Sequence, residues 1–434
     1  SGDIDVDGVT NLDVVDIDGA VDMASTLAVT GIATFTDDII IGDGKTIGSA
    51  SDVDAITIAS NGQLTLTQTL IGTALDISGD IDVDGTSNLD IVDVDVSLDV
   101  NGTIKLDGNY PNGSNNVALG NGALDGSLSG TGLNVAIGDS AMTKNTSGQE
   151  NTAVGRLAMG CNTTGSYNAA FGTNTMQSNT EGEENTAFGM QAMNANTTGD
   201  GNSAVGSNSL GANISGSSNT AVGKRSLKTN TTASNNTAVG FDSLCANTTG
   251  GANTALGRQS LKLNTTAANN VAVGNNSLAS NTTGANNTAL GAESLDTNTE
   301  GADNVAVGYI ALGANTTGVQ NVAVGSLALD ANTTANNNTA LGFQSLTANT
   351  TGANNIAVGS CSMLNNTTGG ENISIGKVAM CCNTEGANNT AIGHIALRAN
   401  TTASNNTAIG YSALTANTTG GGNTAIGLCA LNAN

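Results

Sequence analysis

The stretch Asn236-Thr-Ala-Val-Gly-Phe-Asp-Ser-Leu-Cys-Ala-Asn-Thr-Thr-Gly-Gly-Ala252 is one of 19 copies of a repeat that fills three-quarters of this 434-residue chain. Its glycine occurs at Gly120 and Gly138 and then every 17 residues from Gly155 to Gly427. Such a fixed period is typical of a solenoid, in which each repeat forms one coil stacked on the last. A repeat of this length suits two strands and two turns, so we expect each coil to rise by about 4.8 Å.

We number the positions of each repeat from its glycine, which is position 0. Position −1 is Val, Ile, Leu or Phe, position −2 is Ala except at Ser374, and position +4 is always Leu or Met. We expect these positions, with the usually small residue at +6, to be the apolar positions of two short strands, with Phe171 and Phe188 in the core. We further expect the Ala strip to face outward, where sister chains approach and complete a core that is too small in one chain.

Two asparagine positions are equally regular. Asn occupies position −4 in all 19 copies and position +7 in 18 of them. Identical amides that are stacked one strand spacing apart can form a hydrogen-bonded ladder, and Asn tolerates the backbone angles of corners. We therefore interpret the Asn-Thr-Thr triplets as structural and not as glycosylation sites. The predicted ladder residues include Asn151, Asn168, Asn236, Asn247, Asn270 and Asn281.

Two copies of the repeat carry a family resemblance. Asn270-Val-Ala-Val-Gly-Asn-Asn-Ser-Leu-Ala and Asn304-Val-Ala-Val-Gly-Tyr-Ile-Ala-Leu-Gly resemble the head repeats of trimeric autotransporter adhesins of the YadA type, whose motif is Asn-x-Val-Ala-Ile-Gly-x-x-Ser-x-Ala. The resemblance covers about residues 115–434 and implies a left-handed parallel β-roll of three chains packed side by side. An inserted Asn-Thr-Thr-Gly loop departs from the family pattern. The same repeats also occur in phage tail-fibre proteins, which the flanking sequence resembles more closely.

Residues 1–108 differ from the repeats in composition. They hold 21 of the 36 acidic residues and only two lysines, which gives −19 of the net charge of −25. The stretch Ser1-Gly-Asp-Ile-Asp-Val-Asp-Gly returns at Ser78, 77 residues later, and its alternation predicts strands, as does Gln63-Leu-Thr-Leu-Thr. We predict an all-β protein in three parts. An acidic, β-rich trimeric shaft spans residues 1–108, a joint spans 109–115, and a parallel β-solenoid of 17-residue coils spans 116–434.

The acidic shaft offers one candidate metal site. Asp80, Asp82 and Asp84 are spaced like the start of an EF-hand loop, but the twelfth position is Ile91, where that loop needs Glu. We therefore reject an EF-hand. Clustered carboxylates on neighbouring strands of a trimer could still hold Ca²⁺, against the simpler interpretation of solvated acidic faces. We expect no other cofactor.

The composition excludes several classes of function. The negative charge argues against binding to nucleic acid or to an anionic membrane surface, and no apolar stretch is long enough to span a membrane. The chain has one histidine, His394, and no nucleophile–base spacing, so we expect no enzyme. The six cysteines do not fall in matching positions of adjacent coils, so we expect free thiols, with Cys161 and Cys382 inward and Cys245 and Cys381 outward.

Four aromatic residues share position +1, directly after the repeat glycine, and His394 occupies the same position. In stacked coils this position forms one line along the solenoid, and exposed rings are suited to stacking on sugars. The alternative is that the four rings share a position by chance or pack between chains. The candidate ligand-binding residues are Phe241, Tyr309, Phe343 and Tyr411.

These observations favour a homotrimeric structural fibre. We expect a phage tail fibre, located in the virion, that reaches a polysaccharide or protein receptor on a host surface. The alternatives are a trimeric adhesin on a bacterial cell surface and a self-assembling extracellular filament. Ice binding, which needs a regular Thr array, is disfavoured because Glu181, Glu300 and Glu385 interrupt the Thr pairs.

Overall fold

The computed structural model describes residues 18–23, 26–36, 39–42, 45–49, 52–61, 63–66, 115–126 and 132–433. The chain divides into two units, residues 1–99 and 100–434, which we describe separately. The described residues contain strands and turns and no helix, so the predicted all-β class is confirmed for this part of the chain.

The first unit contains a small antiparallel sheet in the order β1-β2-β3, formed by β1 (Lys45–Ser49), β2 (Asp52–Ile58) and β3 (Leu64–Leu66). Thr57 of β2 lies opposite Thr65 of β3, so the strand that was predicted in the Thr-rich stretch is confirmed. The carboxylates of Asp80, Asp82 and Asp84, and the predicted joint as far as residue 114, lie outside the described residues.

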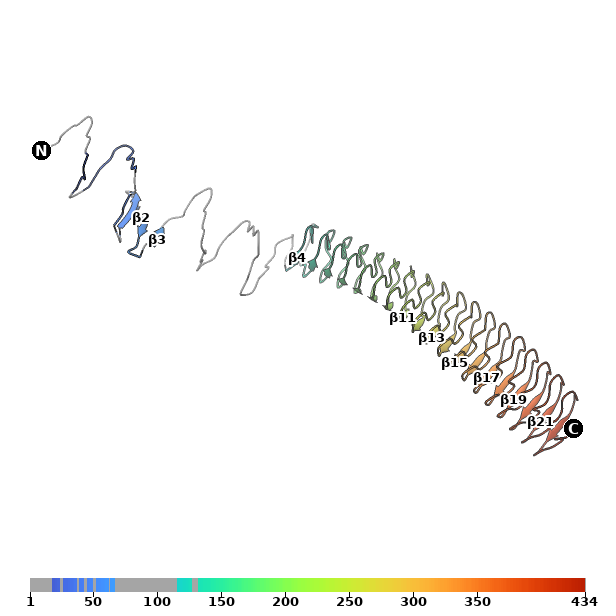
Figure 1. Ribbon diagram of the computed structural model, residues 1–434. Helices are drawn as coiled ribbons and strands as arrows, with labels where there is room; N and C mark the ends of the chain where they lie inside the picture. The colour runs from blue at the N-terminus through green and yellow to red at the C-terminus, as the bar shows by residue number, and fades with distance from the viewer. Residues whose placement is uncertain are drawn as a thin grey trace, which may run out of the picture. The chain divides into compact units, whose positions relative to one another are not determined.

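The second unit is a parallel β-solenoid with one three-residue strand in each repeat (Figure 1). Each strand pairs in parallel with the strand of the next coil, and equivalent residues lie opposite one another, as Ala255 and Ala272 do. The predicted one coil per 17-residue repeat is therefore confirmed. The strands are β4 (Val117–Leu119), β5 (Val135–Ile137), β6 (Thr152–Val154), β7 (Ala169–Phe171), β8 (Thr186–Phe188), β9 (Ser203–Val205), β10 (Thr220–Val222), β11 (Thr237–Val239), β12 (Thr254–Leu256), β13 (Val271–Val273), β14 (Thr288–Leu290), β15 (Val305–Val307), β16 (Val322–Val324), β17 (Thr339–Leu341), β18 (Ile356–Val358), β19 (Ile373–Ile375), β20 (Thr390–Ile392), β21 (Thr407–Ile409) and β22 (Thr424–Ile426).

The other side of each coil is a chain of turns, so the prediction of two strands per coil is wrong. In the coil that contains β13, Asn276 and Leu278 have φ angles of 55° and 52°, in the left-handed region. Two such residues, at positions +2 and +4, prevent an extended strand, although residues with a Cβ adopt this region at a cost. Backbone bonds still join the coils here, because the N–H of Leu278 donates to the carbonyl of Ser294 in the next coil at 3.0 Å.

The strands turn inward the face that we predicted to point outward. Ala at position −2 is fully buried, as Ala272 is, and it packs inside the coil with the buried Leu278 of position +4. Position −1 points outward, and Leu256 is 47% exposed there. The expectation of an outward Ala strip is therefore wrong. So is the placement of the −1 aromatics in the core, because Phe188 is 55% exposed and its ring stacks on that of Phe171 at 5.0 Å.

Both predicted asparagine ladders are present and buried. At position −4, the backbone N–H of Asn270 donates to Oδ1 of Asn253 at 3.0 Å, and the N–H of Asn287 donates to Oδ1 of Asn270 at 2.9 Å. At position +7, Nδ2 of Asn281 donates to Oδ1 of the preceding amide at 2.9 Å. The same stacking joins Asn151, Asn168, Asn236 and Asn247 to their neighbours.

The two ladders meet at one carbonyl in each coil. Nδ2 of Asn270 and Nδ2 of Asn281 both donate to the oxygen of Gly284, at 3.0 Å and 2.9 Å. The two amides therefore close the five-residue loop of positions +8 to +12 from both sides. A Thr at position +8 adds a third stack, in which the hydroxyl of Thr282 donates to the carbonyl of Thr299 at 2.9 Å.

Candidate functional site

The four predicted ligand-binding aromatics are all solvent-exposed at position +1. The exposed fractions are 40% for Phe241, 52% for Tyr309, 50% for Phe343 and 51% for Tyr411. The preceding glycine, with φ of 136° at Gly240, turns the chain out of the strand, so position +1 lies at the edge of the strand side. The rings therefore share one line along the solenoid, separated by four, two and four coils.

The neighbours of these rings differ along the line. The ring of His394, one coil before Tyr411, lies 5.4 Å from the Tyr411 ring between centroids and is tilted by 33°. Phe241 is instead flanked in the same position by the exposed cations Lys224 and Arg258. The line is therefore not a uniform aromatic surface. It includes one ring pair and one ring between two positive charges.

Charges sort onto different sides of the coil, a feature that our sequence analysis missed. All nine Lys and Arg residues of the solenoid lie at positions +1 to +6, which we call the turn face. Positions +9 to +12, which we call the loop face, hold nine carboxylates and no cation. Positions −3 and −1, which we call the strand face, carry no charge in any coil. Sorting the charged residues by repeat position would have revealed this from sequence.

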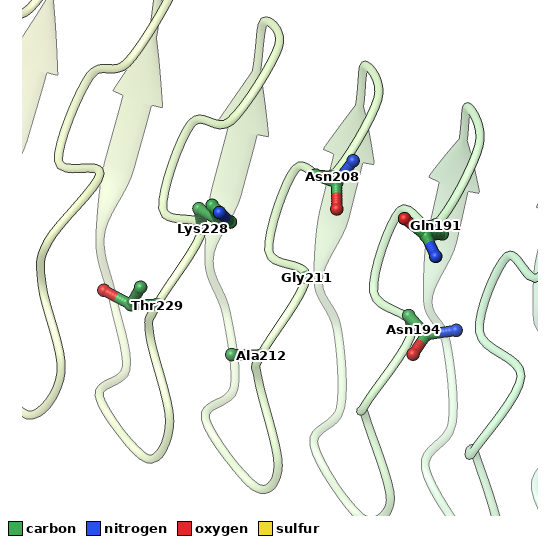
Figure 2. A pocket seen from close by; sticks show the side chains of 7 residues that line it. All are labelled: Gln191, Asn194, Asn208, Gly211, Ala212, Lys228 and Thr229. Carbon is green, nitrogen blue, oxygen red and sulfur yellow. The ribbon is translucent and has the colours of Figure 1, made fainter.

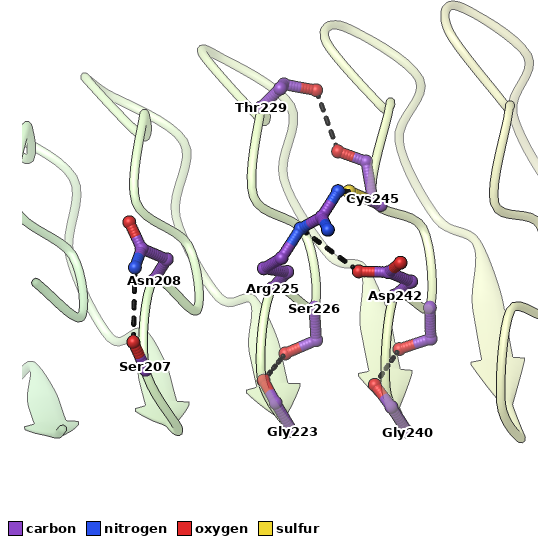
Figure 3. Close-up of polar contacts among 10 residues, drawn as sticks. Ser207, Asn208, Gly223, Arg225, Ser226, Thr229, Gly240, Asp242 and Cys245 are labelled. Atoms are coloured by element: carbon purple, nitrogen blue, oxygen red, sulfur yellow. Dashed lines mark hydrogen bonds and ion pairs between the residues drawn. The ribbon is translucent and has the colours of Figure 1, made fainter. Parts of the chain in front are cut away.

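One ion pair on the turn face joins a partly exposed arginine to a buried aspartate (Figure 3). Nε of Arg225 lies 3.2 Å from Oδ1 of Asp242 in the next coil, and the Asp242 side chain is only 5% exposed. Both atoms are buried and have no hydrogen-bond partner beyond this pair. The guanidinium also reaches Sγ of Cys245 at 3.8 Å. The carboxylate of Asp242 is thus paired with Arg225.

A shallow depression of about 230 Å³ lies on the same face (Figure 2). It crosses three consecutive coils, and its floor is open because the residues at positions +5 and +6 of the middle coil are small. Amide side chains line one end and a lysine lines the other. The lining residues are Gln191, Asn194, Asn208, Gly211, Ala212, Lys228 and Thr229.

Two carboxyl groups of the turn face have perturbed acidity. Burial raises the pKa of Asp330 above its ordinary value of 3.8. Burial also raises the pKa of Asp296, and repulsion from Glu293 adds to that shift. Within the described ranges, no group of three His, Cys, Asp or Glu side chains is arranged to hold a metal ion.

The six cysteines are free, as predicted, but their placement differs from our expectation. Cys245 was expected to point outward and is buried, whereas Cys161 and Cys382 were expected inward and are half-exposed. Cys381 is half-buried, and its Sγ lies 3.6 Å from Sγ of Cys382. Burial, together with the Cys382 thiol, raises the pKa of Cys381 to about 12, which disfavours the reactive thiolate.

In the part of the chain that the structure describes, no helix has the length and apolar character to cross a bilayer. Comparisons of the chain with protein-family models, with curated proteins and with solved structures find no match.

Proposed function

We propose that this chain is a non-enzymatic structural fibre protein whose copies associate along the strand face as a homotrimer. The observation that carries the proposal is the uncharged strand face, where Val, Leu, Ile and Phe at position −1 form an apolar row along 19 parallel strands, beside position −3, which is Thr in ten strands and Val, Ile, Ala or Ser in the others. Many of these side chains are 36% to 68% exposed. An exposed apolar row of this length, with no charge beside it, is typical of a protein–protein interface.

The thin interior of the coil supports the same conclusion. Each coil encloses a small residue at positions −2 and +3, one Leu or Met at position +4 and the asparagines of the two ladders, so a single chain buries little apolar area for its length. Burial contributes about 25 cal/mol for each Å² of apolar surface, and association along the strand face would add this stabilisation in every coil. The number three follows from the resemblance to trimeric head repeats.

The proposed role of such a fibre is that of a phage tail fibre, which holds a binding surface away from the virion and reaches a receptor on a host cell. A stack of coils in continuous register suits this role because every coil is joined to the next by strands and by amide ladders. The exposed rings at position +1 offer contacts to a surface polysaccharide or protein.

The oligomeric state tests the structural half of the proposal. A triple variant places charges on the strand face, and a matched control places the same charges on exposed loop-face threonines. The variant is V239D/V273D/V307D, and the control is T249D/T283D/T317D. Multi-angle light scattering should give a trimer for the wild type and the control and a smaller species for the variant. A monomeric wild type would refute association.

Immunogold electron microscopy of the source culture tests the role itself. We expect an antibody against the solenoid to label virion tails. Label on the envelope of cells would instead favour a surface adhesin, and label on free filaments would favour a self-assembling structural protein.

A further inference from the structure

Four cations lie within three consecutive coils of the turn face. Lys224 and Arg258 occupy position +1 of the coils that begin at Gly223 and Gly257, and Lys228 and Lys262 occupy position +5 of the same two coils. The coil between them has Phe241 at position +1. At about 4.8 Å for each coil, the two cations of each position are about 10 Å apart.

No neighbouring carboxylate neutralises this group. Between residues 201 and 292 the chain contains five cations and one acidic residue, Asp242. Asp242 is nearly buried and pairs with Arg225, the fifth cation (Figure 3). Among the described residues, the other four cations form no ion pair. The local charge is therefore positive in a chain whose net charge is −25.

The depression on the turn face extends from this cation group. Lys228 lines one end of it, and the amides of Asn208, Asn194 and Gln191 continue away from that lysine (Figure 2). Nδ2 of Asn194 and Nδ2 of Asn208 already donate to neighbouring protein oxygens, so these two side chains offer their amide oxygens as acceptors, which suits the hydroxyl donors of a polyhydroxylated ligand. The exposed face of Phe241 offers a surface on which a sugar ring can stack.

We infer that the turn face between Lys224 and Lys262 binds an anionic polysaccharide, with carboxylates of the polymer at Lys224 and Arg258 and a sugar ring on Phe241. This inference rests on the proposed function and assigns a ligand class and a position to its receptor-binding surface. Arg258 suits a carboxylate because its planar guanidinium pairs with both oxygens. The inferred ligand also explains why Phe241, alone among the four exposed rings at position +1, lies between two cations.

Polygalacturonate binding to the full chain tests the inference, with neutral dextran as the uncharged probe. The variant K224S/R258S removes two cations of the group, and Ser is native at position +1 at Ser207, Ser326 and Ser360. The control R156S/K377S removes one Arg and one Lys from the same position outside the group. We expect binding to weaken by about tenfold in the variant and to be retained in the control, because charge-assisted contacts are lost only in the variant.

A second variant, Phe241→Ser, separates carbohydrate from other polyanions. It should weaken polygalacturonate binding and leave the binding of inorganic polyphosphate unchanged. If Phe241→Ser binds polygalacturonate as tightly as the wild type does, or if the wild type binds single-stranded DNA as tightly as polygalacturonate, the carbohydrate assignment is overturned. If K224S/R258S and the control R156S/K377S lose polygalacturonate binding equally, the effect is one of general charge and the site is overturned.

The outcomes distinguish this inference from the proposed function. A wild-type trimer that labels virion tails but binds no polygalacturonate would overturn only the ligand assignment. A different result would be that the wild type binds no polygalacturonate but self-associates laterally at low salt, and that K224S/R258S loses this self-association. The cations would then bind the acidic loop face of another copy, and the inference would be overturned as well. Label on cells or filaments would overturn the tail-fibre role whatever the chain binds.

Discussion

The backbone N–H of Asn287 donates to the side-chain oxygen of Asn270, 17 residues earlier, at 2.9 Å. The side chain of one coil thus completes the backbone hydrogen bonding of the next. Both residues are fully buried, so water cannot replace the lost partner. This relationship recurs along position −4 and makes the amides part of the structural repeat.

We expect Asn270→Ala to destabilise the solenoid by about 1–3 kcal/mol, because it leaves the N–H of Asn287 and part of the Gly284 carbonyl unpaired. The matched control is Asn275→Ala, at an exposed position of the same coil. Thermal and chemical unfolding measure the difference. Equal shifts for the two variants would contradict a stabilising role of the buried ladder.

We expect substitution of the repeat glycine to destabilise the solenoid more than substitution of a ladder asparagine. Gly257 has φ of 138°, and a Cβ there would lie 2.7 Å from the carbonyl carbon of Gly274 in the next coil. Gly257→Ala should therefore cost at least about 1–3 kcal/mol from backbone strain, with the steric overlap in addition. Gly251→Ala is the control, because Ala is native at the same repeat position at Ala268 and Ala285. If Gly257→Ala unfolds at the same temperature and denaturant concentration as the wild type, this packing is contradicted.

The repeat period and the amide ladders could be predicted from sequence because each depends on residue identity at a fixed spacing. The orientation of the strands was missed, although the sequence contained it. Side chains two apart share one face of a strand, so a buried Asn270 requires a buried Ala272 and an outward Val273. Both Ala and Val are apolar, and hydropathy alone does not decide between them.

The turn side could not be predicted in the same way. Leu278 and Asn276 adopt left-handed φ angles that residues with a Cβ rarely populate, and the hydrogen bonds of the adjacent coils hold them there. No local pattern indicates this conformation. The separation of charge among the faces, by contrast, is visible once residues are sorted by repeat position.

The raised pKa of Asp330 predicts a pH-dependent stability difference. The folded state keeps this proton to a higher pH than the unfolded chain, so the contribution of the carboxyl to stability falls as pH rises above 3.8 through its raised value. Asp330→Asn should therefore be more stable than the wild type at neutral pH, and the advantage should shrink as the pH falls toward 3.8. Melting temperatures at several pH values test this, with Glu300→Gln on the exposed loop face as control. A constant advantage across the range would exclude titration as its cause.

The aromatic line at position +1 carries the last prediction. Phe241, Tyr309, Phe343 and Tyr411 span ten coils, or about 48 Å at one strand spacing for each coil. This span is too wide for one small pocket, but it suits repeated weak contacts along a polymer, strengthened by avidity from three chains.

Alanine at all four positions should abolish adsorption to host cells and leave the melting temperature nearly unchanged, because the rings are about half exposed. The control is the matched set of exposed loop-face changes Thr249→Ala, Thr283→Ala, Thr317→Ala and Thr351→Ala. A large drop in melting temperature would show that the rings pack between chains. Unchanged adsorption with an intact fold would place the receptor contacts elsewhere on the fibre, because the four rings are then not needed for attachment.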